Sequence, residues 1–289
     1  MVNDGKLRKL GRSLLPPLVA RSLAPLWPSR EQATLEYFPG GWDASNSVTV
    51  QGWDNEIIVE AERAKWKAFV DNLREPGPVG FSHEHADPTV VRSVSFHNIH
   101  LTYAYVLARA ARQKGELSVL DWGGGLGHYY ALGKAMLPDL KLRFDCRDVP
   151  LICKAGRELC PEVRFFDDDS CLSNRYDLVM VNGSLGYFPD WRELLVKLTK
   201  TVKQYFFLTR VLAVNEVPSF VVLQHTTAYN YNSDMLTQVF NEGELLDVLQ
   251  MGGLKLVREF VVGDGPTISG APEQCRDCGW LFEQSAIDS

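Results

Sequence analysis

The sequence predicts an α/β fold with a doubly wound, mostly parallel sheet. From residue 116 onward, short runs of buried-type residues alternate with amphipathic helical patterns, and this alternation is typical of a parallel sheet covered by helices on both faces. A glycine-rich run at residues 123–127 separates the first strand from the next helix. The 289 residues are 45% hydrophobic and 23% charged, which is a globular composition and excludes a disordered chain or a disulfide mini-scaffold.

Two helices are expected before the sheet begins. The segment Asn55–Asn72 carries apolar residues at helical spacing and ends before the breaker sequence at 75–78. Residues 96–112 repeat apolar side chains with a helical period. Residues 36–54 are expected to form an ordered irregular lead-in. The predicted organisation is a basic leader at 1–35, a helical N-terminal extension or lid at 36–114 and a sheet domain at 115–289.

The sheet domain shows clear helix starts. Asp190 with Glu193, and Asn241 with Glu244, have the capping-box pattern that begins a helix. A long loop rather than a helix joins the last two strands, which predicts an antiparallel C-terminal strand. The strands are expected at 117–121, 141–146, 163–166, 176–182, 204–209, 254–261 and near 279–283, and the helices at 128–137, near 150–160, from 190 and from 241.

The charge of the chain is unevenly distributed. The formal net charge is −6, yet residues 1–30 hold six basic residues and one acidic residue. An acidic body argues against a protein that binds nucleic acid mainly through electrostatics. Prolines break the short apolar run at 14–20, and no run reaches the roughly 18–20 residues that span a bilayer, so no transmembrane segment is expected. The leader is expected to be a solvated tail, with weak peripheral contact with an anionic membrane as the alternative.

The cysteine and histidine patterns do not predict a metal site. Cys275 and Cys278 form a CxxC pair, but a structural zinc needs two further ligands and no second pair exists. The run His83-Glu84-His85 resembles a ligand set in composition only, because no helix-spaced HExxH motif follows it. The six cysteines suggest no disulfide framework and fit reduced thiols in a cytoplasmic protein.

The glycine-rich run lies where an open α/β sheet binds its ligand, beyond the carboxyl end of a strand. Glycines let the backbone approach a ligand, and the N-terminus of the following helix favours an anionic group. A dinucleotide fingerprint reads GxGxxG, but the sixth position counted from Gly123 is His128. The run instead reads Asp121-x-Gly123-x-Gly125-x-Gly127, with an acid before the glycines.

This pattern resembles the DxGxGxG motif of class I S-adenosylmethionine-dependent methyltransferases. Asp148 follows the second strand, where an acid binds ribose hydroxyls, and Asp168 follows the third, where that family contacts the adenine amine. Residues 176–182 match the family's fourth-strand motif. The resemblance implies a Rossmann-like methyltransferase sheet and S-adenosyl-L-methionine as cofactor. The implied cofactor-binding residues are Asp121, Gly123, Gly124, Gly125, Gly127, Asp148, Asp168, Asn182 and Gly183.

A narrower resemblance is to a family of bacterial methyltransferases associated with envelope-polysaccharide or secondary-metabolite gene sets. It is carried by residues 122–125 and 183–190 and by Gln224, and it covers the chain from about Tyr37 to Phe282. The family commonly has a glutamine where Gly186 stands, so the contacts of that position differ here. The resemblance implies a small-molecule or saccharide acceptor.

The favoured acceptor group is a hydroxyl. The motif that marks methylation of exocyclic amines, Asn/Asp-Pro-Pro-Tyr/Phe, is absent, since residues 182–185 read Asn-Gly-Ser-Leu. Transfer to a hydroxyl needs a base near the strand ends, and His225 is the first candidate, with Tyr187 as a second catalytic candidate. The residues expected to bind the substrate are His97, His128 and Tyr229.

Two other functions stay open. One is a non-catalytic subunit with a methyltransferase fold that binds a partner, against which the intact glycine run and Asp148 argue. The other is a nicotinamide-dependent oxidoreductase, which the missing third glycine of the dinucleotide fingerprint disfavours.

Overall fold

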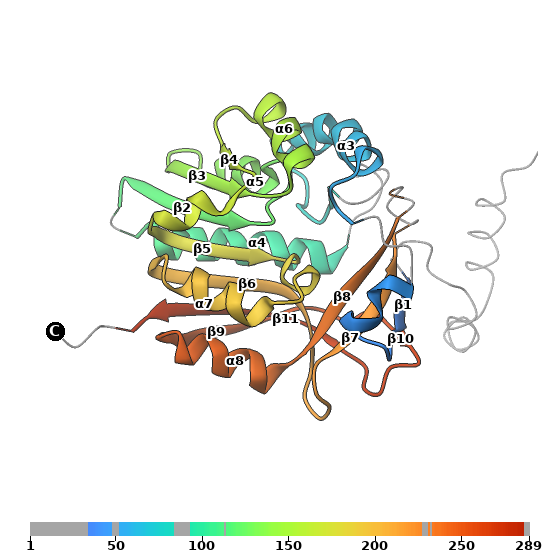
Figure 1. The fold of residues 1–289 in the computed structure, drawn as a ribbon. Coiled ribbons are helices and arrows are strands. Elements are labelled where there is room, and N and C mark those ends of the chain that lie inside the picture. Colours follow the sequence, from blue (N-terminus) through green and yellow to red (C-terminus); the bar gives the residue numbers. More distant parts are fainter. Residues whose placement is uncertain are drawn as a thin grey trace, which may run out of the picture. The chain divides into compact units, whose positions relative to one another are not determined.

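The computed structural model describes residues 34–47, 52–83, 93–112, 114–226, 231 and 233–285, which belong to one compact unit running from Ala33 to Ser289 (Figure 1). The predicted basic leader lies outside the described residues, except for its last two. No helix in the described part of the chain combines the length and apolar character that crossing a membrane requires.

A mostly parallel sheet forms the centre of the structure, as the sequence predicts. Its strands are β2 (Glu116–Trp122), β3 (Lys141–Arg147), β4 (Arg164–Phe166), β5 (Tyr176–Asn182), β6 (Val202–Val214), β9 (Leu254–Gly263) and β11 (Arg276–Gln284). The parallel strands lie in the order β4-β3-β2-β5-β6. Beyond β6 the sheet continues through β11, which is antiparallel to both β6 and β9. The chain moves outward from β2 to β4 and then returns with β5 to the other side of β2, so the strand order reverses between β2 and β5.

Helices cover both faces of this sheet. They are α3 (Glu56–Arg74), α4 (Val94–Ala110), α5 (His128–Met136), α6 (Pro150–Leu159), α7 (Trp191–Thr199) and α8 (Glu242–Met251). Side chains of α3 to α6 share one hydrophobic core with one face, and α7 and α8 share a second core with the other. In β2, Val119 belongs to the first core and Leu120 to the second, as the alternation of side chains along a strand requires. The helices of the predicted N-terminal extension are therefore part of the main core.

Four further strands, which the sequence analysis does not predict, lie beside the carboxyl ends of the parallel strands (Figure 1). They are β1 (Thr34–Tyr37), β7 (Phe220–His225), β8 (Asp234–Asn241) and β10 (Ile268–Ser269). We call them the antiparallel extension: β7 is antiparallel to both β8 and β1, and only β10 is parallel to its neighbour β1. The extension joins the central sheet where β8 runs beside Ala213 and Val214 of β6. The lead-in expected at 36–54 therefore begins as a strand. A segment of four residues carries too little pattern to predict a strand, and this one forms because it pairs with β7.

The helix starts match the sequence in part. Asn55 begins α3 and Asn241 begins α8, each accepting a hydrogen bond from a backbone N–H of the first turn, at 2.9 and 3.1 Å. The cap expected of Asp190 does not form, because its backbone has φ −90° and ψ 39° instead of the extended conformation of a capping residue.

His100 on α4 gives the fold a dependence on pH. Its ring is 3% exposed, and its Nδ1 lies 2.7 Å from the carbonyl oxygen of Val79. Burial lowers the pKa of His100 from 6.5 to about 4, and the nearby charge of Arg210 acts in the same direction. Because the folded pKa is the lower one, the unfolded chain binds the proton first. The stability that neutral His100 provides is therefore complete above pH 6.5 and is lost as the pH falls toward 4.

We expect this loss to be measurable in a His100→Asn variant, which removes the titration. Between pH 7 and pH 4, the free energy of unfolding should fall by roughly 3 kcal/mol more in the wild-type protein than in the variant. Urea denaturation followed by circular dichroism measures the difference. Parallel pH profiles of the two proteins would contradict the prediction.

Candidate functional site

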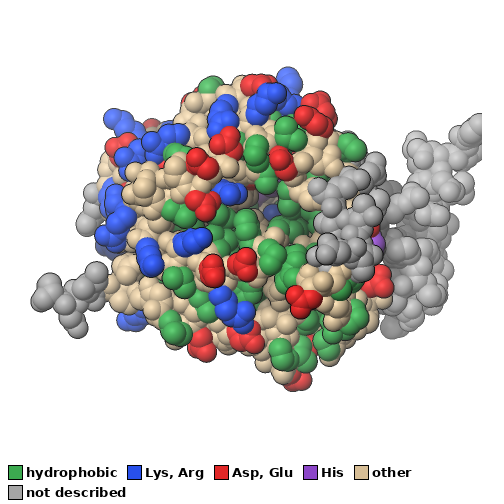
Figure 2. Space-filling view, in the orientation of Figure 1, with side chains coloured by type: hydrophobic (Ala, Val, Ile, Leu, Met, Phe, Trp, Pro, Cys, Tyr) green, Lys and Arg blue, Asp and Glu red, His purple; other side chains and the backbone are tan. Residues whose placement is uncertain are grey.

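A cavity opens where the strand order reverses, at the carboxyl ends of β2 and β5. Open α/β sheets bind their ligands at this point. Figure 2 shows a hollow near the middle of this face, with hydrophobic side chains around it and both charge signs interspersed on the surface. The lining residues used below are Trp53, Glu62, His83, Asp121, Gly123, Gly124, Gly125, Arg147, Asp148, Asn182, Gly183, Ser184, Tyr187, Arg210, Gln224 and Tyr231.

The glycine run forms one wall of the cavity with its backbone. Gly123, Gly125 and Gly127 have φ of 74°, 62° and 92°, values that residues with a side chain rarely adopt. Gly124 has no room for a side chain, because a Cβ atom there would lie 2.4 Å from Oδ2 of Asp121. Gly127 is not part of the lining but stands at the N-terminus of α5. The sequence therefore needs glycine here to keep the wall thin and open.

Two buried polar side chains border the cavity without a hydrogen-bond partner among the described residues. Asp121, at the end of β2, is 0% exposed, and neither carboxyl oxygen has a partner. Burial, and then the charge of Asp148, raises the pKa of Asp121 well above its ordinary value. Asn182, at the end of β5, is 8% exposed, and neither its amide oxygen nor its nitrogen has a partner. Buried polar groups are nearly always paired, so these two side chains mark a place where a polar ligand fits.

Asp148, which follows β3, is hydrogen-bonded to the glycine run. It accepts hydrogen bonds from the backbone N–H of Gly125 at 2.8 Å and of Val149 at 2.7 Å. Burial raises the pKa of the Asp148 carboxyl, and these two hydrogen bonds partly oppose the rise. Each carboxylate oxygen keeps a further lone pair, so Asp148 can accept a ligand hydroxyl without releasing the loop.

Aromatic side chains and an amide form another part of the cavity wall. The Tyr187 hydroxyl donates a hydrogen bond to Oε1 of Gln224 at 2.7 Å. Trp53 packs edge-on against both Tyr187 and Tyr231, with ring centroids 5.1 and 5.7 Å apart. Gln224 belongs to the antiparallel extension and Tyr231 lies in the connection between β7 and β8, so the sequence analysis could not assign these residues without knowing how these strands pair.

Arg210 brings a positive charge into the cavity through an irregularity in β6. It has φ 57°, the only positive φ among the described residues that are not glycine. It lies at a bulge, because Thr209 pairs with Gly279 and Val211 with Cys278. A Cβ atom on Gly183 would lie 3.3 Å from the Arg210 guanidinium, which is therefore directly over that glycine. Backbone strain of this kind concentrates at functional sites.

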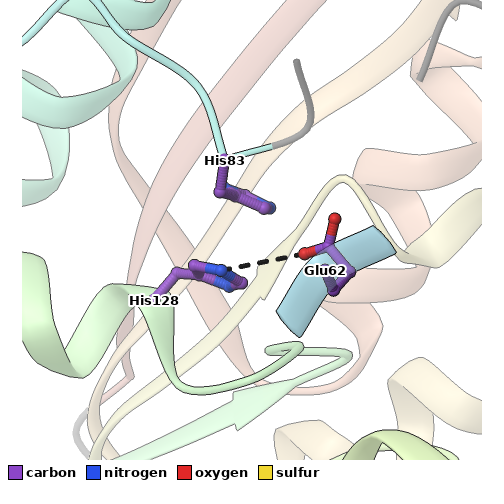
Figure 3. Close-up of side chains that lie close together, drawn as sticks. All are labelled: Glu62, His83 and His128. Atoms are coloured by element: carbon purple, nitrogen blue, oxygen red, sulfur yellow. Dashed lines mark ion pairs between the residues drawn. The ribbon is translucent and has the colours of Figure 1, made fainter. Parts of the chain in front are cut away.

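Three further side chains meet beside the cavity (Figure 3). Glu62 of α3, His83 and His128 of α5 place one ligating atom each within 4.8 Å of one another. We call them the Glu-His-His cluster. The His83 and His128 rings stack with centroids 3.9 Å apart, and Nε2 of His128 lies 3.7 Å from Oε2 of Glu62. From sequence, His83 is considered as a metal ligand and set aside, and His128 is expected to bind substrate. Glu62 is missed, because its only signal is an acidic residue among the buried positions of a helix.

The structure places two predicted residues away from the cavity. Asp168 is exposed and caps the short 3₁₀ helix Asp169–Ser173 by accepting from the backbone N–H of Ser170 at 2.9 Å. His225 follows Gln224 on β7, and successive strand residues point to opposite faces. His225 is thus not a lining residue, and its Nδ1 lies 2.8 Å from Oδ1 of Asp234. Counting positions after a strand does not reveal either a capping turn or the direction of a side chain. The assignment of His225 as the base therefore stays a prediction that its position does not support.

Some of the remaining predicted residues line the cavity and others do not. His97 is half-buried in the first turn of α4 and is not among the lining residues, whereas Tyr187 is. Tyr229 lies outside the described residues. Cys275 and Cys278 join no group of three or more potential metal ligands in the described part of the chain.

Comparisons with known proteins match no family model and no curated protein. Several solved structures are similar at low identity. The 1,6-didemethyltoxoflavin-N1-methyltransferase of Burkholderia thailandensis has 16% identity and a TM-score of 0.46, with 83% of this chain and 94% of that chain covered. The magnesium protoporphyrin IX methyltransferase of Synechocystis PCC 6803 has 13% identity and a TM-score of 0.45, with 82% and 100% covered.

A third similar structure is the sugar N-methyltransferase of Streptoalloteichus sp ATCC 53650, with 12% identity, a TM-score of 0.45, and 65% of this chain and 87% of that chain covered. The function of this chain therefore rests on its own residues, beginning with those at the strand reversal.

Proposed function

We propose that this protein is an S-adenosylmethionine-dependent methyltransferase that acts on a small-molecule or saccharide acceptor, with a hydroxyl group favoured. One observation carries the proposal: the glycine run, Asp121, Asp148 and Asn182 converge on one cavity at the strand reversal. The resemblance of the DxGxGxG pattern supplies the identity of the cofactor. The buried polar atoms of Asp121 and Asn182 that lack partners among the described residues fit the amine and hydroxyl groups of such a ligand.

Each wall of the cavity has a role in this proposal. The thin backbone around Gly124 and the carboxylate of Asp148 hold the nucleoside half of the cofactor. The Arg210 guanidinium, over Gly183, holds the carboxylate of its methionine half. Asp168 is exposed and does not line the cavity, and we assign it no contact with the cofactor.

Bound S-adenosylmethionine supplies an activated methyl group on its sulfonium. The chain then has to align the acceptor with that group and exclude water. Tyr187 and Gln224 form a hydrogen-bonded pair in the wall of the cavity, and we assign them to orient the acceptor. The net charge of −6 and the mixed surface charge in Figure 2 favour a small acceptor over a nucleic acid. The resemblance to methyltransferases associated with envelope-polysaccharide or secondary-metabolite gene sets favours a saccharide or another small molecule.

Calorimetric titration distinguishes this function from its two alternatives. Micromolar binding of S-adenosylhomocysteine with no binding of NAD is the expected result. Binding of NAD alone would indicate an oxidoreductase. Binding of S-adenosylhomocysteine without methyl transfer to any component of fractionated cell extracts, assayed with a radiolabelled methyl donor, would indicate a non-catalytic subunit. Tandem mass spectrometry of the labelled product then identifies the methylated atom.

The Arg210→Met variant tests which half of the cofactor the guanidinium contacts. We expect its affinity for S-adenosylhomocysteine to fall about tenfold, roughly 1.4 kcal/mol, because a charge-assisted hydrogen bond is lost. Its affinity for 5′-methylthioadenosine, which lacks the amino acid group, should not change. Calorimetry with both ligands checks the pair of results, and equal losses for the two ligands would argue for a general distortion of the cavity.

A further inference from the structure

The Glu-His-His cluster has the composition of a metal site. Two imidazole nitrogens and one carboxylate oxygen form the protein ligand set of catalytic zinc sites, which leave a fourth position open. The three side chains come from separate parts of the chain: α3, the segment after it, and the residue that follows the glycine run. Glu62 and His83 also line the cavity. The fold therefore assembles the set at the edge of the proposed active site.

The distances suit a cation better than a direct contact. Zinc lies about 2.1 Å from nitrogen and oxygen ligands, so two ligand atoms in a tetrahedral site are about 3.4 Å apart. Nε2 of His128 and Oε2 of Glu62 are 3.7 Å apart, which is too long for a hydrogen bond and close to this separation. All three ligand atoms lie within 4.8 Å, so the widest pair needs to close by at most about 1.4 Å. The His83 and His128 rings are stacked, so binding one cation through both requires His83 to rotate out of this stack.

Glu62 uses its two carboxylate oxygens differently. Oε1 accepts a hydrogen bond from the Tyr231 hydroxyl at 2.5 Å and one from Nζ of Lys65 at 3.3 Å. Oε2 is the atom that faces His128. Groups that bind the outer oxygen of a ligating carboxylate fix its orientation in metal sites. Glu62 and His128 are 5% and 2% exposed, and burial of a carboxylate at this depth favours pairing or coordination.

The geometry points to a binding site for a divalent cation of the zinc type, formed by Glu62, His83 and His128, with its open position toward the cavity. The binding of the cation does not depend on the proposed function, but its role does. An acceptor hydroxyl bound at the open position has a lowered pKa and releases its proton to solvent. Its oxygen then forms the new C–O bond as the C–S bond of the sulfonium breaks and S-adenosylhomocysteine leaves.

Cobalt is the probe for this site, because Co²⁺ replaces zinc and absorbs visible light in a four- or five-coordinate site. The full-length protein, treated with a chelator, is titrated with Co²⁺ and the bound cobalt is then displaced by Zn²⁺. We expect one equivalent to bind. Glu62→Gln and His83→Asn should each weaken binding by at least about tenfold. The matched control is His225→Asn. It also removes a histidine that contacts a carboxylate, that of Asp234, but outside the cavity. This variant should bind Co²⁺ like the wild type.

Two outcomes overturn the proposal: no cobalt spectrum in the wild-type protein, or the same affinity in His83→Asn as in the wild type. Circular dichroism of each variant shows whether it has folded. His83 is only half-buried, so the His83→Asn variant still tests the proposal if the variant of the buried Glu62 does not fold. Titration of the same samples with S-adenosylhomocysteine separates the two proposals. A protein that binds cobalt but not S-adenosylhomocysteine refutes the proposed methyltransferase function. A protein that binds S-adenosylhomocysteine but not cobalt refutes the metal site and leaves the proposed function standing.

Discussion

A Gly124→Ala variant is expected to lose cofactor binding by at least about 100-fold, or 2.7 kcal/mol. The new Cβ atom would lie 2.4 Å from Oδ2 of Asp121 and 2.8 Å from Sγ of Cys146. Both of these residues are 0% exposed and belong to strands in the middle of the sheet, so neither can move away easily. The glycine run must move instead, into the space that the cofactor needs. Calorimetric titration with S-adenosylhomocysteine measures the loss.

Gly115→Ala is the matched control for this change. Gly115 precedes β2, and a Cβ atom there would have no neighbour within 4 Å. It should leave S-adenosylhomocysteine binding unchanged. Thermal denaturation of both variants shows whether Gly124→Ala is folded at the temperature of the titration. Wild-type affinity in a folded Gly124→Ala protein would mean that the cofactor does not lie against this backbone.

An Asp148→Ala variant is expected to weaken S-adenosylhomocysteine binding by more than about tenfold, or 1.4 kcal/mol. The change removes the proposed acceptor for the ribose hydroxyls. It also leaves the backbone N–H groups of Gly125 and Val149 without their carboxylate, which loosens the glycine run. Calorimetry measures the loss.

Asp168→Ala provides the comparison. Asp148 and Asp168 follow neighbouring strands, but Asp168 is exposed, caps its own turn and does not line the cavity. We expect Asp168→Ala to bind S-adenosylhomocysteine like the wild type. If both variants lost affinity equally, the adenine contact assigned to Asp168 from sequence would be restored, and the cavity would have to extend past β4.

The central sheet and the glycine run could be predicted because their signals are local. The apolar strand from Leu117, the glycines and the helix from His128 follow one another within 20 residues. The fold class, the parallel strands and the antiparallel β11 are therefore confirmed by the structure. The capping prediction at Asp190 was wrong, because the backbone of this residue is not extended.

The other half of the cavity could not be predicted, because it depends on contacts between distant segments. Gln224 reaches the cavity through the pairing of β7 with β8 and β1, and Arg210 through a bulge opposite β11. Glu62 meets His128 across 66 positions of the chain. Gln224 lines the cavity and the predicted base His225 does not, and on a strand one residue is the difference between two faces.

Gly186 shows how closely the antiparallel extension packs beside the site. A Cβ atom there would lie 2.3 Å from Oγ1 of Thr237 on β8, so the extension leaves no room for a side chain at this position.

The narrow attachment of β8 has a consequence for how specificity can change. The extension runs beside β6 for only two residue pairs, yet it supplies Gln224 to the acceptor wall, while the glycine run and Asp148 belong to the parallel strands. The two parts meet at the hydrogen bond from Tyr187, which follows β5, to Gln224. If the proposed function holds, replacing the segment from β7 to β8 should change the acceptor more than it changes the affinity for S-adenosylhomocysteine.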